Sequence, residues 1–332
     1  MGETILVAGG AGYIGSHVCK ALARNGYLPV CYDDLSTGHA SAVKWGPLEK
    51  GRLGDAVRLA EVVDRHRPSA VILLAGFIAV GESVVDPARY YLNNVAETIT
   101  FLNVLKDAGI SHLVFSSSAA VYGAPRQTPV GEDHPTWPAN PYGWTKLMVE
   151  RMLADYAPAY GMRSVALRYF NAAGADPDGE IGEDHDPETH LIPLVLDAAL
   201  GRREAITIFG DDYDTPDGSC VRDYIHVSDL ADAHVLALGW LRGQAQPTAE
   251  AFNLGNGNGY SVKEVIATAG RVTKREIPTR RAGRRNGDPA ILVSDAGRAK
   301  DVLGWTLRHA DLETQIAHAW AWHGKKAAAP TD

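Results

Sequence analysis

Cysteine is scarce in this sequence: the chain of 332 residues carries three, Cys19, Cys31 and Cys220. An odd number without the close spacing of metal-ligand pairs predicts free thiols, as is usual in a reducing cytosol. No apolar stretch reaches the length of about eighteen residues that a membrane-spanning helix needs. The first apolar run, Thr4 to Ala8, lacks the basic flank and the length of a signal peptide. We therefore expect a soluble, cytoplasmic protein with no membrane contact.

Basic residues are also outnumbered, with 32 Lys and Arg against 40 Asp and Glu, which gives a net charge of -8. This balance disfavours a nucleic-acid partner, because nucleic acids repel an acidic surface. The basic run from Arg275 to Arg285 is confined to one segment. Binding of a single diphosphate, or exposure to bulk solvent, accounts for this run better than a nucleic-acid partner does. Apolar residues at 45% exclude the disordered classes, and the length predicts two domains or one large domain with an added lobe.

Strand and helix patterns alternate along the first half of the chain. Short apolar runs predict buried parallel strands, and apolar residues at helical spacing predict the helices between them. This alternation is typical of a doubly wound parallel sheet with helices on both faces, the α/β Rossmann class. From about Asn171 the pattern loosens, and a second, smaller α/β lobe is expected there. The predicted strands are 5–8, 28–32, 70–75, 112–116 and 164–168, and the predicted helices are 13–25, 90–108 and 142–160.

A glycine-rich turn follows the first predicted strand, with Gly9, Gly12 and Gly15 ahead of a helix. Small residues there allow a tight turn and close approach of the backbone to a pyrophosphate at the helix N-terminus. A strand–turn–helix that binds nothing is the alternative. Asp33 after the second strand stands at the spacing of an acid that binds an adenosine ribose. Because Asp34 adds a second negative charge against a 2′-phosphate, we expect NAD rather than NADP.

Tyr142 and Lys146 lie four residues apart on one predicted helix face. Ser118 ends a strand at the carboxyl edge of the sheet, where open α/β folds bind ligands. A lysine cation and an oxidised nicotinamide both favour the phenolate and lower the pKa of Tyr142. The phenolate then accepts a proton from a substrate alcohol as hydride leaves the same carbon. A half-buried tyrosine on a packed helix is the alternative.

These motifs resemble the extended short-chain dehydrogenase/reductase family and, within it, the UDP-glucose 4-epimerases. The similarity covers almost the whole chain: the segments 9–16, 79–83, 93–95, 116–123, 140–143, 167–171 and 221–227 carry it. The resemblance implies a tightly held NAD⁺ that takes hydride from C4 of a UDP-hexose, a 4-keto sugar that turns in the site, and hydride return to the opposite face. UDP-glucose and UDP-galactose are the implied substrates.

The resemblance also implies roles for single residues. Tyr142 is the base, Lys146 its modulator and a cofactor ligand, and Ser118 a hydrogen-bonding partner; Ser118 and Tyr142 also touch the sugar. The implied cofactor site is Gly9, Gly12, Tyr13, Ile14, Gly15, Asp33, Asp34, Leu53, Asn94, Tyr142, Lys146, Tyr169 and Phe170. The implied UDP-sugar site is Asn171, His190, Leu191, Arg222, Arg285, Asp288 and Leu292. We expect residues 1–178, with return segments at about 223–258, to bind NAD, and 179–222 with 259–332 to bind the UDP-sugar.

Three positions depart from the family pattern. Arg52 stands where the family usually has an aspartate at the adenine, and Ile78 where many relatives carry a lysine near the cofactor. Both changes put tight NAD retention in doubt. His190 replaces an asparagine near the diphosphate. With His185, Asp186 and Glu188 it suggests a metal site, but the spacing is not distinctive and the chemistry needs no metal, so no metal is expected.

Other functions compete with this interpretation. A 4,6-dehydratase shares the fold and the Tyr/Lys pair, but Ala119 and Ala120 stand where its acid–base pair follows the hydroxyl residue. A UDP-pentose or UDP-N-acetylhexosamine 4-epimerase stays open, and Leu292 is the position expected to limit bulk at C2 of the sugar. A non-catalytic NAD-binding regulator predicts loss of the catalytic residues, which are intact. Relatives pair the helices 90–108 and 142–160 across a dimer interface, which predicts a homodimer.

Overall fold

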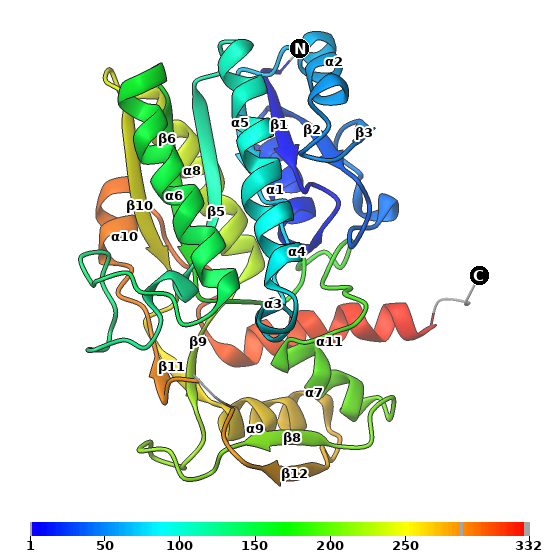
Figure 1. Ribbon diagram of the computed structural model, residues 1–332. Helices are drawn as coiled ribbons and strands as arrows, with labels where there is room; N and C mark the ends of the chain where they lie inside the picture. Colours follow the sequence, from blue (N-terminus) through cyan, green and yellow to red (C-terminus); the bar gives the residue numbers. More distant parts are fainter. Residues whose placement is uncertain (1, 286–287, 329–332) are drawn as a thin grey trace.

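The computed structural model describes residues 2–285 and 288–328, and its largest element is a seven-stranded parallel sheet (Figure 1). The strands lie in the order β10-β6-β5-β4-β1-β2-β3, and each neighbouring pair is parallel. Strand β1 is apolar and almost wholly buried, as expected for a strand covered on both faces. The strands are β1 (Thr4–Ala8), β2 (Leu28–Asp33), β3 (Leu48–Lys50), β4 (Ala70–Leu73), β5 (His112–Ser118), β6 (Arg163–Tyr169) and β10 (Thr248–Leu254).

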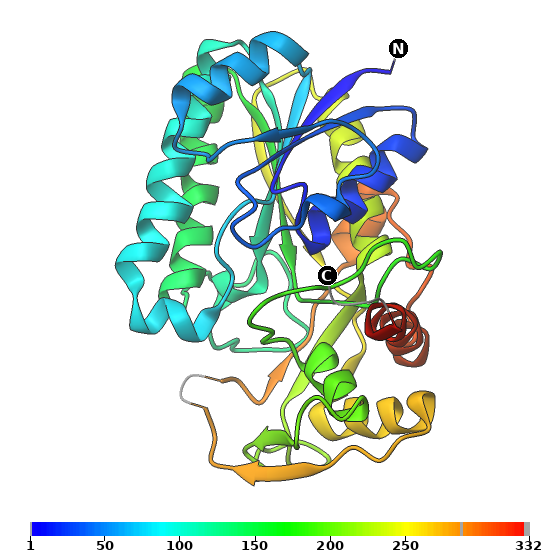
Figure 2. The ribbon, with the colours of Figure 1, turned by 90° about the vertical axis from the view of Figure 1, so that its right-hand side faces the viewer.

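Helices cover both faces of this sheet, which Figure 2 shows edge-on. One buried cluster joins the sheet to α1 (Tyr13–Arg24), α8 (Val227–Arg242) and α10 (Gly297–Leu303). A second cluster joins the other face to α2 (Ala56–His66), α5 (Glu97–Asp107) and α6 (Pro141–Tyr160). The predicted doubly wound α/β fold is confirmed.

The helix predicted over 90–108 differs in detail from the structure. It consists of α4 (Pro87–Tyr91), a π-helical turn η2 (Leu92–Ala96) and α5. Asn94 lies in the π turn, where its side chain accepts from Phe77 N at 2.9 Å and donates to the Phe77 carbonyl at 3.0 Å. The turn therefore ties the helix to the segment after β4. Short elements nearby are η1 (Ala40–Ala42), α3 (Val80–Val85) and η3 (Ala119–Tyr122).

The lower part of Figure 1 contains a smaller group of strands and helices. Strand β9 (Val221–His226) is its centre, paired with β7 (Asn171–Ala173), β11 (Gly259–Ser261) and β13 (Ile291–Leu292). A separate core packs α7, α9 and α11 together. The remaining elements are α7 (Leu191–Ala199), β8 (Ile206–Phe209), α9 (Val262–Thr273), β12 (Thr279–Ala282) and α11 (Leu312–Ala328). Within the described ranges, no helix has the length and apolar character needed to cross a bilayer.

One ion cluster ties α1 to the segment that follows β7. The ammonium of Lys20 lies 2.8 Å from both Asp176 and Asp178 and 2.6 Å from Glu180. Lys20 and Asp176 are buried. The segment 176–190 thus lies against the helix that begins at the glycine-rich turn.

Candidate active site

The glycine-rich turn is closed too tightly to accept side chains. Gly9 has φ +84°, and a Cβ on Gly15 would lie 2.0 Å from the Gly9 carbonyl oxygen. Gly12 is the N-cap of α1 and brings no side chain to the first amides of the helix. These amides are free to bind an anion, and the missing side chains allow close approach. The residues present therefore fit the pyrophosphate of a dinucleotide.

Two carboxylates lie at the end of β2 beside this turn, Asp33 as its last residue and Asp34 directly after it. Asp33 accepts from Ala11 N and from Leu35 N, both at 2.9 Å. Burial raises the pKa of Asp33, and the two backbone amides counteract part of that rise. Asp34 accepts from Ser36 N at 2.8 Å. The pair places negative charge where an adenosine ribose would lie, in agreement with a preference against a 2′-phosphate.

Arg52 pairs with Glu97 at the start of α5. The same carboxylate accepts from Gly54 N at 3.2 Å, so it spans the loop that contains Leu53. Leu53 is buried. Arg52 is thus anchored by an acid on the facing helix, a partner that the sequence did not reveal. A pocket opens here, lined by Arg52, Gly54, Asp55, Leu92, Ala96, Glu97 and Thr100.

The proposed catalytic residues meet where β5 ends and α6 begins. Ser118 is the last residue of β5, and Tyr142 and Lys146 occupy the first two turns of α6. Asn140 caps the helix by accepting from Gly143 N at 2.9 Å. The Lys146 ammonium donates to the Ser116 carbonyl at 2.7 Å and lies 5.8 Å from the centroid of the Tyr142 ring. Sequence reasoning missed Ser83, whose hydroxyl accepts from Tyr142 N at 3.2 Å.

Burial dominates the electrostatics of this group. It raises the pKa of Tyr142, and a hydrogen bond with Ser118 lowers that pKa in part. Burial also lowers the pKa of Lys146 to about 8, while Glu150 acts in the opposite direction. Without a cofactor, the protein alone therefore does not lower the phenol pKa as the sequence reasoning expected. The positive charge of an oxidised nicotinamide would favour the phenolate when the cofactor is bound.

Three further residues of the implied cofactor site, Asn94, Tyr169 and Phe170, are held by contacts within the protein. The Asn94 side chain also donates to Thr145 Oγ1 at 3.2 Å. The Tyr169 hydroxyl is bonded to His234 Nε2, and Tyr169 is buried. Phe170 packs on a small cluster that also contacts Leu292. The polar groups of Asn94 and Tyr169 are therefore engaged within the protein.

Several UDP-sugar candidates lie on the smaller sheet. Arg222 in β9 pairs with Asp288 at 2.7 Å, and Leu292 in β13 is the register partner of Arg222. Asn171 in β7 donates to the Asp223 carbonyl at 2.8 Å. Arg285 lies outside this group, with its guanidinium carbon 3.9 Å from the centroid of the Phe209 ring. His190 is the N-cap residue of α7, followed by Leu191 as its first residue.

Comparison with known proteins decides which family this arrangement represents. The model of the NAD dependent epimerase/dehydratase family matches residues 5–255. The chain belongs to that family. A curated epimerase/dehydratase relative, the UDP-glucose 4-epimerase of Rhizobium leguminosarum bv. trifolii, is 53% identical over 98% of this chain and 98% of its own.

Solved structures agree with this membership of the epimerase/dehydratase family. UDP-glucose 4-epimerase from Brucella ovis, in complex with NAD, is 52% identical with a TM-score of 0.93, covering 96% of this chain and 97% of its own. The enzyme from Bifidobacterium longum, in complex with NAD⁺ and UDP, is 37% identical with a TM-score of 0.93, covering 98% and 99%. The resemblance inferred from the motifs is confirmed over nearly the full chain.

Proposed function

We propose that this chain is an NAD-dependent epimerase that interconverts UDP-glucose and UDP-galactose at C4 of the sugar. The observation that carries the proposal is that half-buried Ser118 meets buried Tyr142 and Lys146 at the carboxyl edge of the sheet. The glycine cradle for a dinucleotide lies at the same edge, as the parallel register of β1, β4 and β5 requires. The names of the related epimerases support the same activity.

Bound NAD⁺ supplies the acceptor for hydride from C4. The protein's task is to move a proton at O4: the Tyr142 oxygen accepts it, and returns it when hydride comes back. Ser118 hydrogen-bonds the same oxygen, and the Lys146 cation favours the phenolate. The buried setting of Tyr142 excludes water from the proton transfer.

The UDP part requires an anchor that holds while the sugar turns. Arg222 suits the diphosphate because its guanidinium presents a planar fork of donors, and the carboxylate of Asp288 suits ribose hydroxyls. Arg285, Asn171, His190 and Leu191 complete the proposed site. We keep residues 1–178 with about 223–258 as the proposed NAD-binding part, and 179–222 with 259–332 as the proposed UDP-sugar part.

The direct test is an incubation of the purified protein with UDP-galactose and no added nicotinamide cofactor. UDP-glucose should form until both sugars reach equilibrium, because the cofactor is regenerated in every cycle. Accumulation of a dehydrated keto sugar would indicate a dehydratase. No conversion, even after NAD is added, would exclude the epimerase.

We also propose a homodimer, on the evidence of apolar side chains on the outer face of the predicted interface. Leu92 is 61% exposed, and Ile99 of α5 and Met148 of α6 are exposed as well. Exposed apolar side chains on the helices of a predicted interface are expected where a second chain covers them. Light scattering at micromolar concentration should give twice the chain mass, and Leu92→Glu should shift it toward one chain. A monomeric parent protein would contradict the proposal.

Three free, buried cysteines support a cytoplasmic location.

A further inference from the structure

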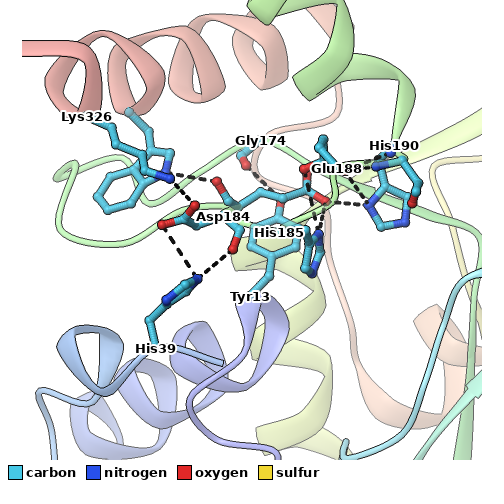
Figure 3. Close-up of polar contacts among 11 residues, drawn as sticks. Tyr13, His39, Gly174, Asp184, His185, Glu188, His190 and Lys326 are labelled. Atoms are coloured by element: carbon cyan, nitrogen blue, oxygen red, sulfur yellow. Dashed lines mark hydrogen bonds and ion pairs between the residues drawn. The ribbon is translucent and has the colours of Figure 1, made fainter. Parts of the chain in front are cut away.

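Two histidines and two glutamates converge in the segment between β7 and α7 (Figure 3). The residues are Glu183, His185, Glu188 and His190, and each offers one ligand atom within 4.8 Å of the others. Glu183 is buried. Both imidazoles present the same atom, Nδ1, to its oxygen Oε1, at 3.2 Å from His185 and 2.5 Å from His190. The sequence spacing alone did not predict this convergence.

The two imidazoles differ in direction: His190 Nδ1 is hydrogen-bonded to Glu183 Oε1, whereas His185 Nδ1 is not aimed at that oxygen. His185 Nδ1 is a buried atom without a hydrogen-bond partner, although Glu183 lies within 3.2 Å. An imidazole nitrogen that close to a carboxylate without being aimed at it is what two ligands of one ion show. Zinc bonds of about 2.0–2.1 Å at tetrahedral angles place ligand atoms about 3.3 Å apart.

The carboxylate of Glu188 also has one atom directed at the other members of the cluster. Its Oε1 accepts from Thr189 N at 2.6 Å and from His190 N at 2.8 Å. Its Oε2 faces His185 Nδ1 at 3.7 Å. Two backbone amides thus fix the carboxylate while one oxygen remains directed at the cluster.

The second acidic group of this region provides a contrast. Asp176, Asp178 and Glu180 also converge, but the Lys20 ammonium occupies their centre. At Glu183 and Glu188 no lysine or arginine is paired among the described residues, so the two carboxylates have only the imidazoles to balance them.

We propose that Glu183, His185, Glu188 and His190 bind one zinc ion in a closed, four-coordinate structural site. Two neutral imidazoles and two carboxylates match both the donor set and the charge that zinc requires. All four positions come from protein, so the ion has no open position for a substrate.

The zinc ion would fix the segment between β7 and α7, which contacts the glycine-rich turn. His185 lies against Tyr13 of the glycine-rich turn, with ring centroids 6.3 Å apart, and Tyr13 donates to the Gly174 carbonyl at 2.7 Å. His190 begins α7. A metal on Nδ1 of His190 would leave the ring's proton on Nε2 as a free donor.

The test measures metal, not turnover, so it is independent of the epimerase assay. The tag-free full-length protein is incubated with zinc chloride, freed of excess zinc by dialysis and analysed by inductively coupled plasma mass spectrometry. We expect about one zinc per chain in the parent protein, and less than one tenth of that in His185→Ala and in Glu188→Gln. Zinc should also raise the melting temperature of the parent protein and leave that of both variants unchanged.

His39→Ala is the matched control, because His39 bonds the neighbouring Asp184 carbonyl at 2.8 Å without belonging to the four (Figure 3). It should retain one zinc per chain. Circular dichroism checks that each variant is folded, and the isosteric Glu188→Gln serves if His185→Ala does not fold. A parent protein that holds no zinc, or folded variants that hold as much as the parent, would overturn the proposal and leave a network of ion pairs in its place.

Discussion

Lys146 is the residue whose burial gives the most quantitative prediction. Its side chain is buried, and burial lowers its pKa from 10.5 to about 8. A shift of that size means that the folded, cofactor-free protein disfavours the ammonium by about 3 kcal/mol. The cost is fully present below pH 8, and it fades as the pH rises through the folded pKa toward the unfolded one. The unfolded chain binds more protons in that window, so stability must rise with pH.

Lys146→Met removes the titration and retains most of the side-chain volume. Between pH 7 and pH 9.5, the free energy of unfolding of the cofactor-free parent should rise by about 2 kcal/mol relative to the variant. Urea unfolding, followed by tryptophan fluorescence at one fixed protein concentration, measures both proteins at each pH. Other groups titrate equally in the two proteins, so the difference isolates Lys146. A difference that stays flat across this range would refute the burial argument.

Three further predictions concern the site. Tyr142→Phe should lower turnover by roughly 10²–10⁴ and stability by only about 1 kcal/mol, because it removes the proton acceptor and one hydrogen bond with Ser118; activity within a factor of a few would remove Tyr142 from its role. Purified protein should carry NAD, at less than one per chain because of Arg52 and Ile78, and stripped protein titrated with both dinucleotides should bind NAD more tightly than NADP; the reverse order would contradict the argument from Asp33 and Asp34. Leu292→Gly should widen the substrate range toward UDP-N-acetyl sugars and Leu292→Tyr should narrow it, each by about ten- to a hundredfold in relative rate; unchanged substrate ratios would mean that Leu292 does not line the sugar pocket.

The sequence predicted the large sheet well because its signals are local. The run Thr4 to Ala8, the glycines after it and the helical spacing from Tyr13 each report on a few consecutive residues. The π turn at Leu92–Ala96 was missed, because the apolar spacing of one wide turn resembles that of an α-helix. The smaller lobe was expected, but its individual strands were not predicted, because β13 has two residues and β7 has three, too few for an alternating pattern.

At the candidate site, the features that could not be predicted from the sequence are contacts between segments far apart in the chain. Glu97 opposite Arg52 and Ser83 beneath Tyr142 carry no local signal, since each depends on how separate elements pack. The raised pKa of Tyr142 likewise follows from burial, which spacing does not report. The convergence of His185 and His190 on one carboxylate depends on the backbone path of a segment without regular structure.

The position of β10 affects how the chain folds during synthesis. This strand pairs with β6 from Thr248 to Leu254, yet α7, β8, β9 and α8 are all made between the two. Until Leu254 has left the ribosome, β6 is paired only with β5, and its other side is an open edge of the sheet. Such edges recruit other chains. A nascent chain stalled before β10 should therefore depend on chaperones or aggregate, although the proposed catalytic residues up to Lys146 have already emerged.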